Sequence, residues 1–386
     1  MKFFINSYFG DNQSIGLLSH IKKRLPYGMD DQWMVFSHYT ERGWTVDNLW
    51  HIFTDFYGGQ YAPLAFLSYL VLYAGFGYDP FYFHMFSLLL HIGCVCLVWK
   101  LISSLLRVHG GVSEKQILYV NFITTLLFAV HPINVEAVAW ISALKVLLYA
   151  FFYLLGLLCY LRYIRTSKIF YYVLTIGCFL CSFWGKEQAV TFPLALLIVD
   201  WFTNRNMKNL EVWSEKMSFL IMAFFFGIIT VLSQGKGPYE MIFPLYQRLL
   251  FGCFALVEYI TKSLLPVNLN FFYPFPIVLG EEPPLHYYLY PVVLLFLMGW
   301  IIAYRNNRYL VFGVLLFLVN LLFSIHLFNM SRHAIVADRY MYLSYVGIAF
   351  LIANGIWWLR KRLSYFKAAL VFLFFYCFFL SVYTFH

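Results

Sequence analysis

Charged residues are scarce in this sequence. Asp, Glu, Lys and Arg make up only 12% of its 386 residues, whereas 62% are hydrophobic. A soluble globular chain carries about a quarter charged residues, and a chain of this length cannot bury so much apolar surface in a core of its own. The composition therefore excludes an ordinary soluble enzyme and predicts an all-α polytopic membrane protein.

Several familiar motifs are also missing. The sequence contains no P-loop, no glycine fingerprint of a dinucleotide-binding fold and no H-E-x-x-H, so neither a nucleotide site nor this zinc motif is indicated. The seven cysteines all fall in apolar runs, which predicts no disulfide framework. Cys178 and Cys181 form a C-x-x-C without a second ligand pair, and we interpret them as two buried small residues.

Long apolar runs fill the chain after residue 80. Most are long enough, or nearly so, for a helix to cross a hydrocarbon core of about 30 Å. Together they predict a bundle of about 10 to 12 transmembrane helices. The runs cover residues 81–106, 116–131, 143–163, 169–185, 188–202, 217–233, 247–266, 288–304, 309–328, 341–359 and 366–385.

Basic residues set the expected orientation. A net charge of +9 would suggest nucleic acid in a soluble protein, but here Lys and Arg lie largely in short loops between apolar runs, so we expect no nucleic-acid partner. These loops carry Lys100, Arg107, Lys115, Arg162, Arg165, Lys168, Arg205, Lys208, Lys216, Arg305, Arg308, Arg360, Lys361, Arg362 and Lys367. All fall on one face, cytoplasmic by the positive-inside rule, if residues 61–77 and 247–266 do not cross. About ten crossings result, with both ends of the chain outside.

The first 80 residues differ from the rest because they are polar and aromatic, with one short apolar run at 61–77. We expect residues 1–80 to form an external acidic loop with interfacial helices, and residues 81–386 to form the transmembrane bundle. No run ahead of Asp30 is long enough to span the membrane, and we expect no repeat domain after the bundle. The Pro-rich loop 266–287 is expected to be extended.

Two adjacent carboxylates, Asp30 and Asp31, stand in this first segment. The simplest interpretation is a solvated loop, or a helix N-terminus where an acid suits the dipole. The alternative is a catalytic pair, in which one carboxylate acts as a general base or holds a metal ion such as Mg²⁺ or Mn²⁺. Neighbours on a helix point about 100° apart, so we expect only one of the two to face the reacting centre.

Further ionisable residues gather on the same outer face. Charges near membrane depth are costly, so they tend to be functional or paired with each other. The candidates are His131, Glu136, Lys145, Lys186, Glu187, Arg332, His333, Asp338 and Arg339. The alternatives are charges that pair within a loop, and for Lys145 a side chain that reaches the interface.

This combination suits one class of chemistry. A phosphate leaving group on a lipid needs positive charge where negative charge develops, which Lys186, Arg332, His333 and Arg339 would supply. An acceptor hydroxyl needs a carboxylate to take its proton, which Asp30 or Asp31 would supply. His131, Glu136, Lys145, Glu187 and Asp338 would support them.

These residues belong to motifs that resemble a known family. Phe128-Ala-Val-His131-Pro132-Ile-Asn-Val-Glu136, Lys186-Glu187-Gln-Ala-Val-Thr191 and Ala337-Asp338-Arg339-Tyr340 are similar to the membrane half of the transmembrane and tetratricopeptide-repeat O-mannosyltransferases and their bacterial relatives. The resemblance runs from about Asp30 to Leu343. It differs at Ala143-Leu144, where the family often has Gly-Arg.

The resemblance implies a membrane glycosyltransferase of the C-type (GT-C) fold, with the acidic motif in its first external loop and the 61–77 helix along the outer interface. The expected reaction moves a sugar from a polyprenyl-phosphate donor to a protein Ser or Thr or to a surface glycan. The expected location is a bacterial inner membrane, with the active face periplasmic. The alternatives are a catalytically inactive scaffold bound to a partner subunit in a larger membrane complex, and a lipid or solute transporter.

Overall fold

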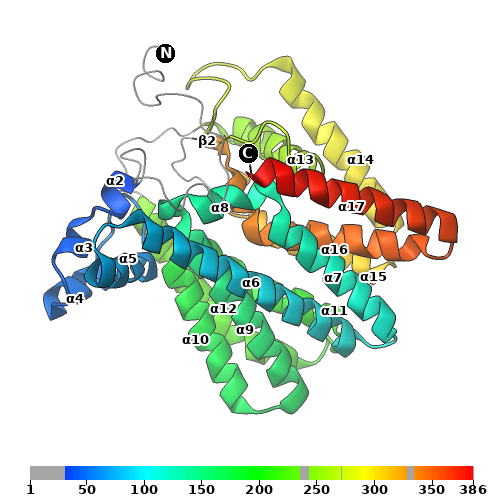
Figure 1. Cartoon of the computed structure of the whole chain (residues 1–386), viewed down its shortest axis with the longest axis horizontal. Coiled ribbons are helices and arrows are strands. Elements are labelled where there is room, and N and C mark those ends of the chain that lie inside the picture. Colours follow the sequence, from blue (N-terminus) through cyan, green and yellow to red (C-terminus); the bar gives the residue numbers. More distant parts are fainter. Residues whose placement is uncertain (1–30, 235–242, 271, 328–333, 386) are drawn as a thin grey trace.

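The computed structural model describes residues 31–234, 243–270, 272–327 and 334–385, and the protein is an all-α polytopic membrane protein (Figure 1). In the first half the helices are α2 (Asp31–Met34), α3 (His38–Glu41), α4 (Val46–Thr54), α5 (Pro63–Phe76), α6 (Pro80–His109), α7 (Glu114–Val130), η2 (Pro132–Asn134), α8 (Val135–Ala139), η3 (Ile141–Ala143), α9 (Leu144–Thr166), α10 (Ile169–Gly185), η4 (Glu187–Thr191) and α11 (Phe192–Phe202).

The second half adds further helices and one small sheet. Its elements are α12 (Leu210–Gln234), α13 (Leu245–Leu264), β1 (Tyr273–Pro274), η5 (Leu285–Tyr288), α14 (Leu289–Ala303), α15 (Arg308–Leu321), β2 (Ala334–Val336), η6 (Asp338–Tyr340), α16 (Met341–Leu359) and α17 (Leu363–Phe385). β1 and β2 pair antiparallel. The loop 266–287 is largely non-helical, in keeping with its prolines.

Six helices in the described ranges are long and apolar enough to cross a membrane, or seven if a bent pair counts as one span. That pair is α7 and the η2–α8 segment, which meet at 53°. The bend lies at His131-Pro132, because proline cannot continue the first helix. α5 is shorter than a full span, and α13 is not among the six.

α9 lies at the centre of the bundle. It packs along α10 and α6, while α16 packs against α15 and α7; Figure 1 shows α9 and α10 running side by side. The α15–α16 contact is close because Gly313 and Gly347 face each other: a Cβ on Gly347 would lie 2.5 Å from the Gly313 carbonyl oxygen. Small residues at a helix crossing are a common way to bring two membrane helices together.

Two of the charged segments expected on one face meet at one end of the bundle. Glu136 contacts Arg339, and Thr384 near the end of α17 donates to the Val130 carbonyl. At the opposite end, His109 bonds the Phe202 carbonyl and Arg308 bonds the Trp201 carbonyl. The turns that follow α6 and α11 and the turn that precedes α15 therefore share the second end.

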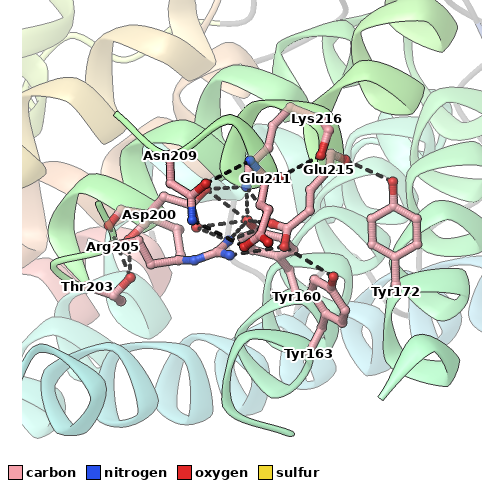
Figure 2. Close-up of polar contacts among 12 residues, drawn as sticks. Tyr160, Tyr163, Tyr172, Asp200, Thr203, Arg205, Asn209, Glu211, Glu215 and Lys216 are labelled. Atoms are coloured by element: carbon pink, nitrogen blue, oxygen red, sulfur yellow. Dashed lines mark hydrogen bonds and ion pairs between the residues drawn. The ribbon is translucent and has the colours of Figure 1, made fainter. Parts of the chain in front are cut away.

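α12 begins at Leu210, seven residues ahead of the run at 217–233 expected from hydrophobicity. The reason is a buried ion-pair network in which the charges of the helix are neutralised (Figure 2). Lys216 contacts Asp200, and Arg205 contacts Asp200 at 3.2 Å and Glu215 at 2.6 Å. The Tyr160 hydroxyl donates to Asp200 at 2.8 Å.

This network corrects part of the orientation argument. The sequence predicts Arg205 and Lys216 to be loop charges, but Lys216 is fully buried and both cations are paired with carboxylates. They hold α9, α11 and α12 together, so they do not contribute free positive charge to that face.

Candidate active site

Asp31 lies at the N-terminal end of the helix at the bundle centre. Its fully buried carboxylate accepts a hydrogen bond from the backbone N–H of Ser142 at 2.9 Å and another from the Ser142 hydroxyl. Ser142 belongs to η3, the turn that opens α9. N–H groups at a helix start lack helical partners, and the dipole there favours an anion. Asp31 therefore anchors α2 to the start of α9.

Lys145 lies one turn further along the same segment. Its Nζ donates to the side-chain oxygen of Gln60 at 2.6 Å and contacts the Met34 sulfur at 3.5 Å. The ammonium is thus held between α2 and the segment that precedes α5.

Arg339 and Glu136 form an ion pair at one end of the bundle. The backbone N–H of Arg339 donates to Glu136 Oε2 at 2.6 Å, and its guanidinium contacts Oε1. The guanidinium also lies 4.9 Å from the ring centre of Trp140 and 5.2 Å from that of Tyr340. Arg339 is therefore held by one carboxylate and two aromatic rings, an arrangement that favours a cation.

Lys186 joins this group through the same tyrosine. Its Nζ lies 4.6 Å from the Tyr340 ring centre, so Lys186 and Arg339 both contact one ring. Gly185 makes this possible: a Cβ on Gly185 would lie 2.7 Å from the backbone nitrogen of Tyr149, so only glycine lets α10 end this close to α9. Two of the expected phosphate-binding cations are thus brought together.

One short segment joins the carboxylate to the cations. Glu136 and Trp140 contact Arg339, whereas Ser142 holds Asp31 and Lys145 lies beyond it. Trp140 and Ser142 are two residues apart, so their Cα atoms lie within about 7 Å. The acidic and basic groups therefore flank the same stretch of chain, although they come from distant parts of the sequence.

Three expected supporting residues have other surroundings. Asp338 does not pair with Arg339; its carboxylate accepts from the Tyr273 hydroxyl at 2.9 Å and lies 3.8 Å from Lys262 Nζ. His131 is buried, with Nδ1 accepting from the Ile133 N–H and its ring 4.2 Å from that of Tyr345. Glu187 makes no ion pair within the described ranges.

Three further candidates, Asp30, Arg332 and His333, lie outside the described residues. In the part of the chain that the structure describes, no group of three or more His, Cys, Asp or Glu side chains is placed to hold a metal ion. Asp31 is the described member of the acidic pair, and any metal held by the pair would also need Asp30.

Sequence reasoning missed several residues of this site. Tyr340 stands in the quoted Ala337–Tyr340 motif without an assigned role, and Trp140 lies four residues after Glu136, so their position near Glu136 and Arg339 in the sequence was the available signal. The sequence contains no comparable signal for Lys262 and Tyr273. Lys262 lies in an apolar run and Tyr273 in the Pro-rich loop, and neither pattern indicates a role in the site. Burial of Tyr273 and the neighbouring Asp338 carboxylate raise the pKa of the tyrosine, so its hydroxyl stays protonated and donates.

The sequence is similar to those of several known proteins. The chain is 32% identical over 189 residues to the protein O-mannosyl-transferase TMTC2 of Mus musculus, covering 45% of this chain and 21% of the relative. It is 33% identical over 189 residues to the human TMTC2, with the same coverage. It is 28% identical over 172 residues to Tmtc3 of Drosophila melanogaster, covering 40% of this chain and 18% of the relative. The chain is related to these protein O-mannosyl-transferases.

The relationship concerns part of each protein. The match spans about a fifth of the length of the TMTC2 relatives. No family model and no solved structure matches the chain. The relatives support a glycosyltransferase at the level of the family.

Proposed function

We propose that the protein transfers a sugar from a polyprenyl-phosphate donor to a hydroxyl acceptor at the outer end of its bundle. The observation that carries the proposal is the shared contact of Lys186 and Arg339 with the Tyr340 ring, next to the segment that holds Asp31. Two cations near one carboxylate are what a phosphate leaving group and a hydroxyl nucleophile require. The names of the relatives support the same reaction class.

The proposed reaction is a single displacement. The acceptor oxygen attacks the anomeric carbon, the bond from that carbon to the phosphate oxygen breaks, and the lipid phosphate leaves with the bonding electrons. Lys186 and Arg339 stabilise the charge that develops on the phosphate. The hydroxyl proton passes to a carboxylate of the Asp30–Asp31 pair, and the sugar is transferred with inversion.

The pair divides into two roles in this proposal. Asp31 is fully buried and bound to Ser142, so it serves as the anchor of the acidic motif. Asp30 is assigned the reacting role, as general base or metal ligand. A bound Mg²⁺ or Mn²⁺ would polarise the acceptor hydroxyl.

The acceptor and the compartment are also part of the proposal. The printed names of the relatives favour a protein acceptor over a glycan. The active end faces the external side of the membrane, which in a bacterium is the periplasmic side of the inner membrane. The named relatives come from animals. We therefore propose only that the active end faces the external side of the membrane, and we do not assign the protein to a bacterial inner membrane.

The test is a transfer assay with purified protein in lipid nanodiscs, a labelled mannosyl-phosphoryl polyprenol and a Ser/Thr-rich peptide. We expect Asp30→Asn to lower turnover by at least about 100-fold, since a general base contributes that much, while the melting temperature stays that of the wild type. Arg339→Met should raise the donor KM at least tenfold, because a charge-assisted hydrogen bond contributes about 1.5–3 kcal/mol.

The matched control is Arg308→Met, which removes an arginine at the opposite end of the bundle. It should leave donor KM within about twofold. Full turnover in Asp30→Asn would contradict the role of the acidic pair. A folded wild-type protein without transfer that copurifies with a larger partner would instead support the inactive scaffold, and uptake of the donor into liposomes without transfer would support a transporter.

A further inference from the structure

Lys262 is a buried cation that the proposed reaction does not use. It lies near the end of α13 with 2% of its surface exposed. Its Nζ lies 2.6 Å from the Tyr273 hydroxyl, 3.3 Å from the Asn268 carbonyl oxygen and 3.8 Å from Asp338 Oδ1. A buried ammonium is costly unless it is paired and hydrogen-bonded, so these contacts explain how it is kept there.

Tyr273 links Lys262 to the segment that carries Arg339. Its hydroxyl donates to Asp338 at 2.9 Å, and its ring centre lies 4.0 Å from Lys262 Nζ. The backbone is tied at the same place, because Tyr273 in β1 pairs with Val336 in β2. α13 adds a second tie through the Tyr259 hydroxyl, which accepts from the Ala337 N–H at 3.2 Å.

The contacts of Lys262 and Tyr273 reach Asp338, the residue directly before Arg339. Asp338 and Arg339 are consecutive in the single turn of η6, so fixing the Asp338 carboxylate on one side fixes the direction in which the Arg339 side chain leaves the turn. Glu136 then receives both the backbone N–H and the guanidinium of Arg339. The turn is thus held on one side by Lys262 and Tyr273 and on the other by Glu136.

We propose that Lys262 and Tyr273 are positioning residues that hold Asp338, and through it Arg339, in the geometry that binds the phosphate of a polyprenyl-phosphate lipid. This inference rests on the proposed function, since it takes Arg339 as a phosphate-binding residue. Neither positioning residue touches the lipid. A side chain fixed before binding loses little conformational freedom when the phosphate arrives, which raises affinity.

The experiment measures the dissociation constant of a short-chain polyprenyl monophosphate for the full chain in nanodiscs. Tyr273→Phe, which removes only the hydroxyl, and Lys262→Met, which removes the ammonium but keeps a side chain of similar length, should each raise this constant about tenfold. Lys262→Arg should restore most of the affinity, because it returns a cation to the same place. The matched control is Tyr246→Phe, whose hydroxyl donates to Glu282 at 2.9 Å in the same external region but away from η6, and it should bind like the wild type.

A second measurement separates positioning from folding. If Lys262 and Tyr273 served only to stabilise the fold, the variants would melt earlier and the folded fraction would bind lipid phosphate with wild-type affinity, which would overturn the inference. If wild type binds the phosphate but transfers no sugar, the proposed function fails while the inference stands. If wild type binds no polyprenyl phosphate at all, both are overturned.

Discussion

Hydrogen bonds from the turn at the start of α9 hold the Asp31 side chain in place. Asp31 receives two of them from Ser142, one from the backbone and one from the hydroxyl. Ser142→Ala keeps the first and removes the second. We expect a loss of about 1.5–3 kcal/mol in stability, since a hydrogen bond to a charged group contributes about that much, visible as a lower melting temperature in detergent.

The control for this prediction is Ser103→Ala. The Ser103 hydroxyl bonds only the Lys100 carbonyl oxygen within its own helix, so its loss should leave the melting temperature almost unchanged. Equal effects of the two substitutions would mean that the Ser142 hydroxyl does not hold Asp31.

At the scale of residues, the sequence indicated most of the charged candidates but not their partners. Glu136 and Arg339 stood out as costly charges, and they do meet. Asp338 was expected to support the same group, yet it turns to Lys262 and Tyr273. The pairs Lys262–Asp338 and Glu136–Arg339 join residues 76 and 203 positions apart in the sequence. A local sequence pattern carries no information about such distant contacts.

At the scale of elements, the approach of α10 to α9 depends on Gly185. A methyl group there would lie 2.7 Å from the Tyr149 backbone nitrogen, so α10 would have to move and carry Lys186 with it. We expect Gly185→Ala to destabilise the protein by about 1–3 kcal/mol, the usual effect of overpacking, and to weaken polyprenyl-phosphate binding.

Gly177→Ala in the same helix is the matched control. Nothing lies within 4 Å of a Cβ at Gly177, and alanine favours helix over glycine by up to about 1 kcal/mol. This variant should be as stable as the wild type or slightly more so. Wild-type stability and binding in Gly185→Ala would show that the close approach does not position Lys186.

The ion-pair network at the other end of the bundle makes a second prediction at this scale. Asp200→Asn leaves the fully buried Lys216 without its closest carboxylate, and breaking a buried pair costs about 3–5 kcal/mol. Adding Lys216→Met should recover part of that loss, because no unmatched charge remains. Melting temperatures of the two single variants and the double variant measure the coupling.

The exposed pair of Arg107 and Glu114 provides the comparison. Arg107→Gln should cost at most about 1 kcal/mol, as surface pairs do. Strictly additive losses in the Asp200 and Lys216 variants would contradict the description of the network as one unit.

Hydrophobicity predicted the helices well because membrane helices must satisfy their own backbone hydrogen bonds along an apolar stretch. The expected runs at 169–185 and 341–359 coincide with α10 and α16. The prediction was wrong at the start of α12, because Lys216 was expected in a loop but is neutralised inside the bundle by Asp200 and Glu215. Where a helix with charged residues begins depends on whether those residues form ion pairs, and a hydropathy pattern does not contain that information.

At the scale of the whole molecule, we expect the two ends of the bundle to lie on opposite sides of a membrane. Thr54 at the end of α4 and Asn206 in the turn before α12 are both exposed. The ring of Phe53, next to Thr54, lies 5.3 Å from that of Trp184 near Lys186, whereas Asn204, two residues before Asn206, donates to the His109 carbonyl at the opposite end. Thr54→Cys should react with an impermeant maleimide in intact cells, whereas Asn206→Cys should react only after the membrane is opened. Wild-type protein controls for its native cysteines, and labelling of both from one side would contradict the topology.

The central claim is that a lipid phosphate binds where Lys186 and Arg339 share the Tyr340 ring. The most direct test is a cryo-EM map of the protein in nanodiscs with a bound polyprenyl phosphate. We expect phosphate density in contact with both cations, on the side of the 136–145 segment that faces Arg339. Phosphate density at the opposite end of the bundle, or next to neither cation, would contradict it.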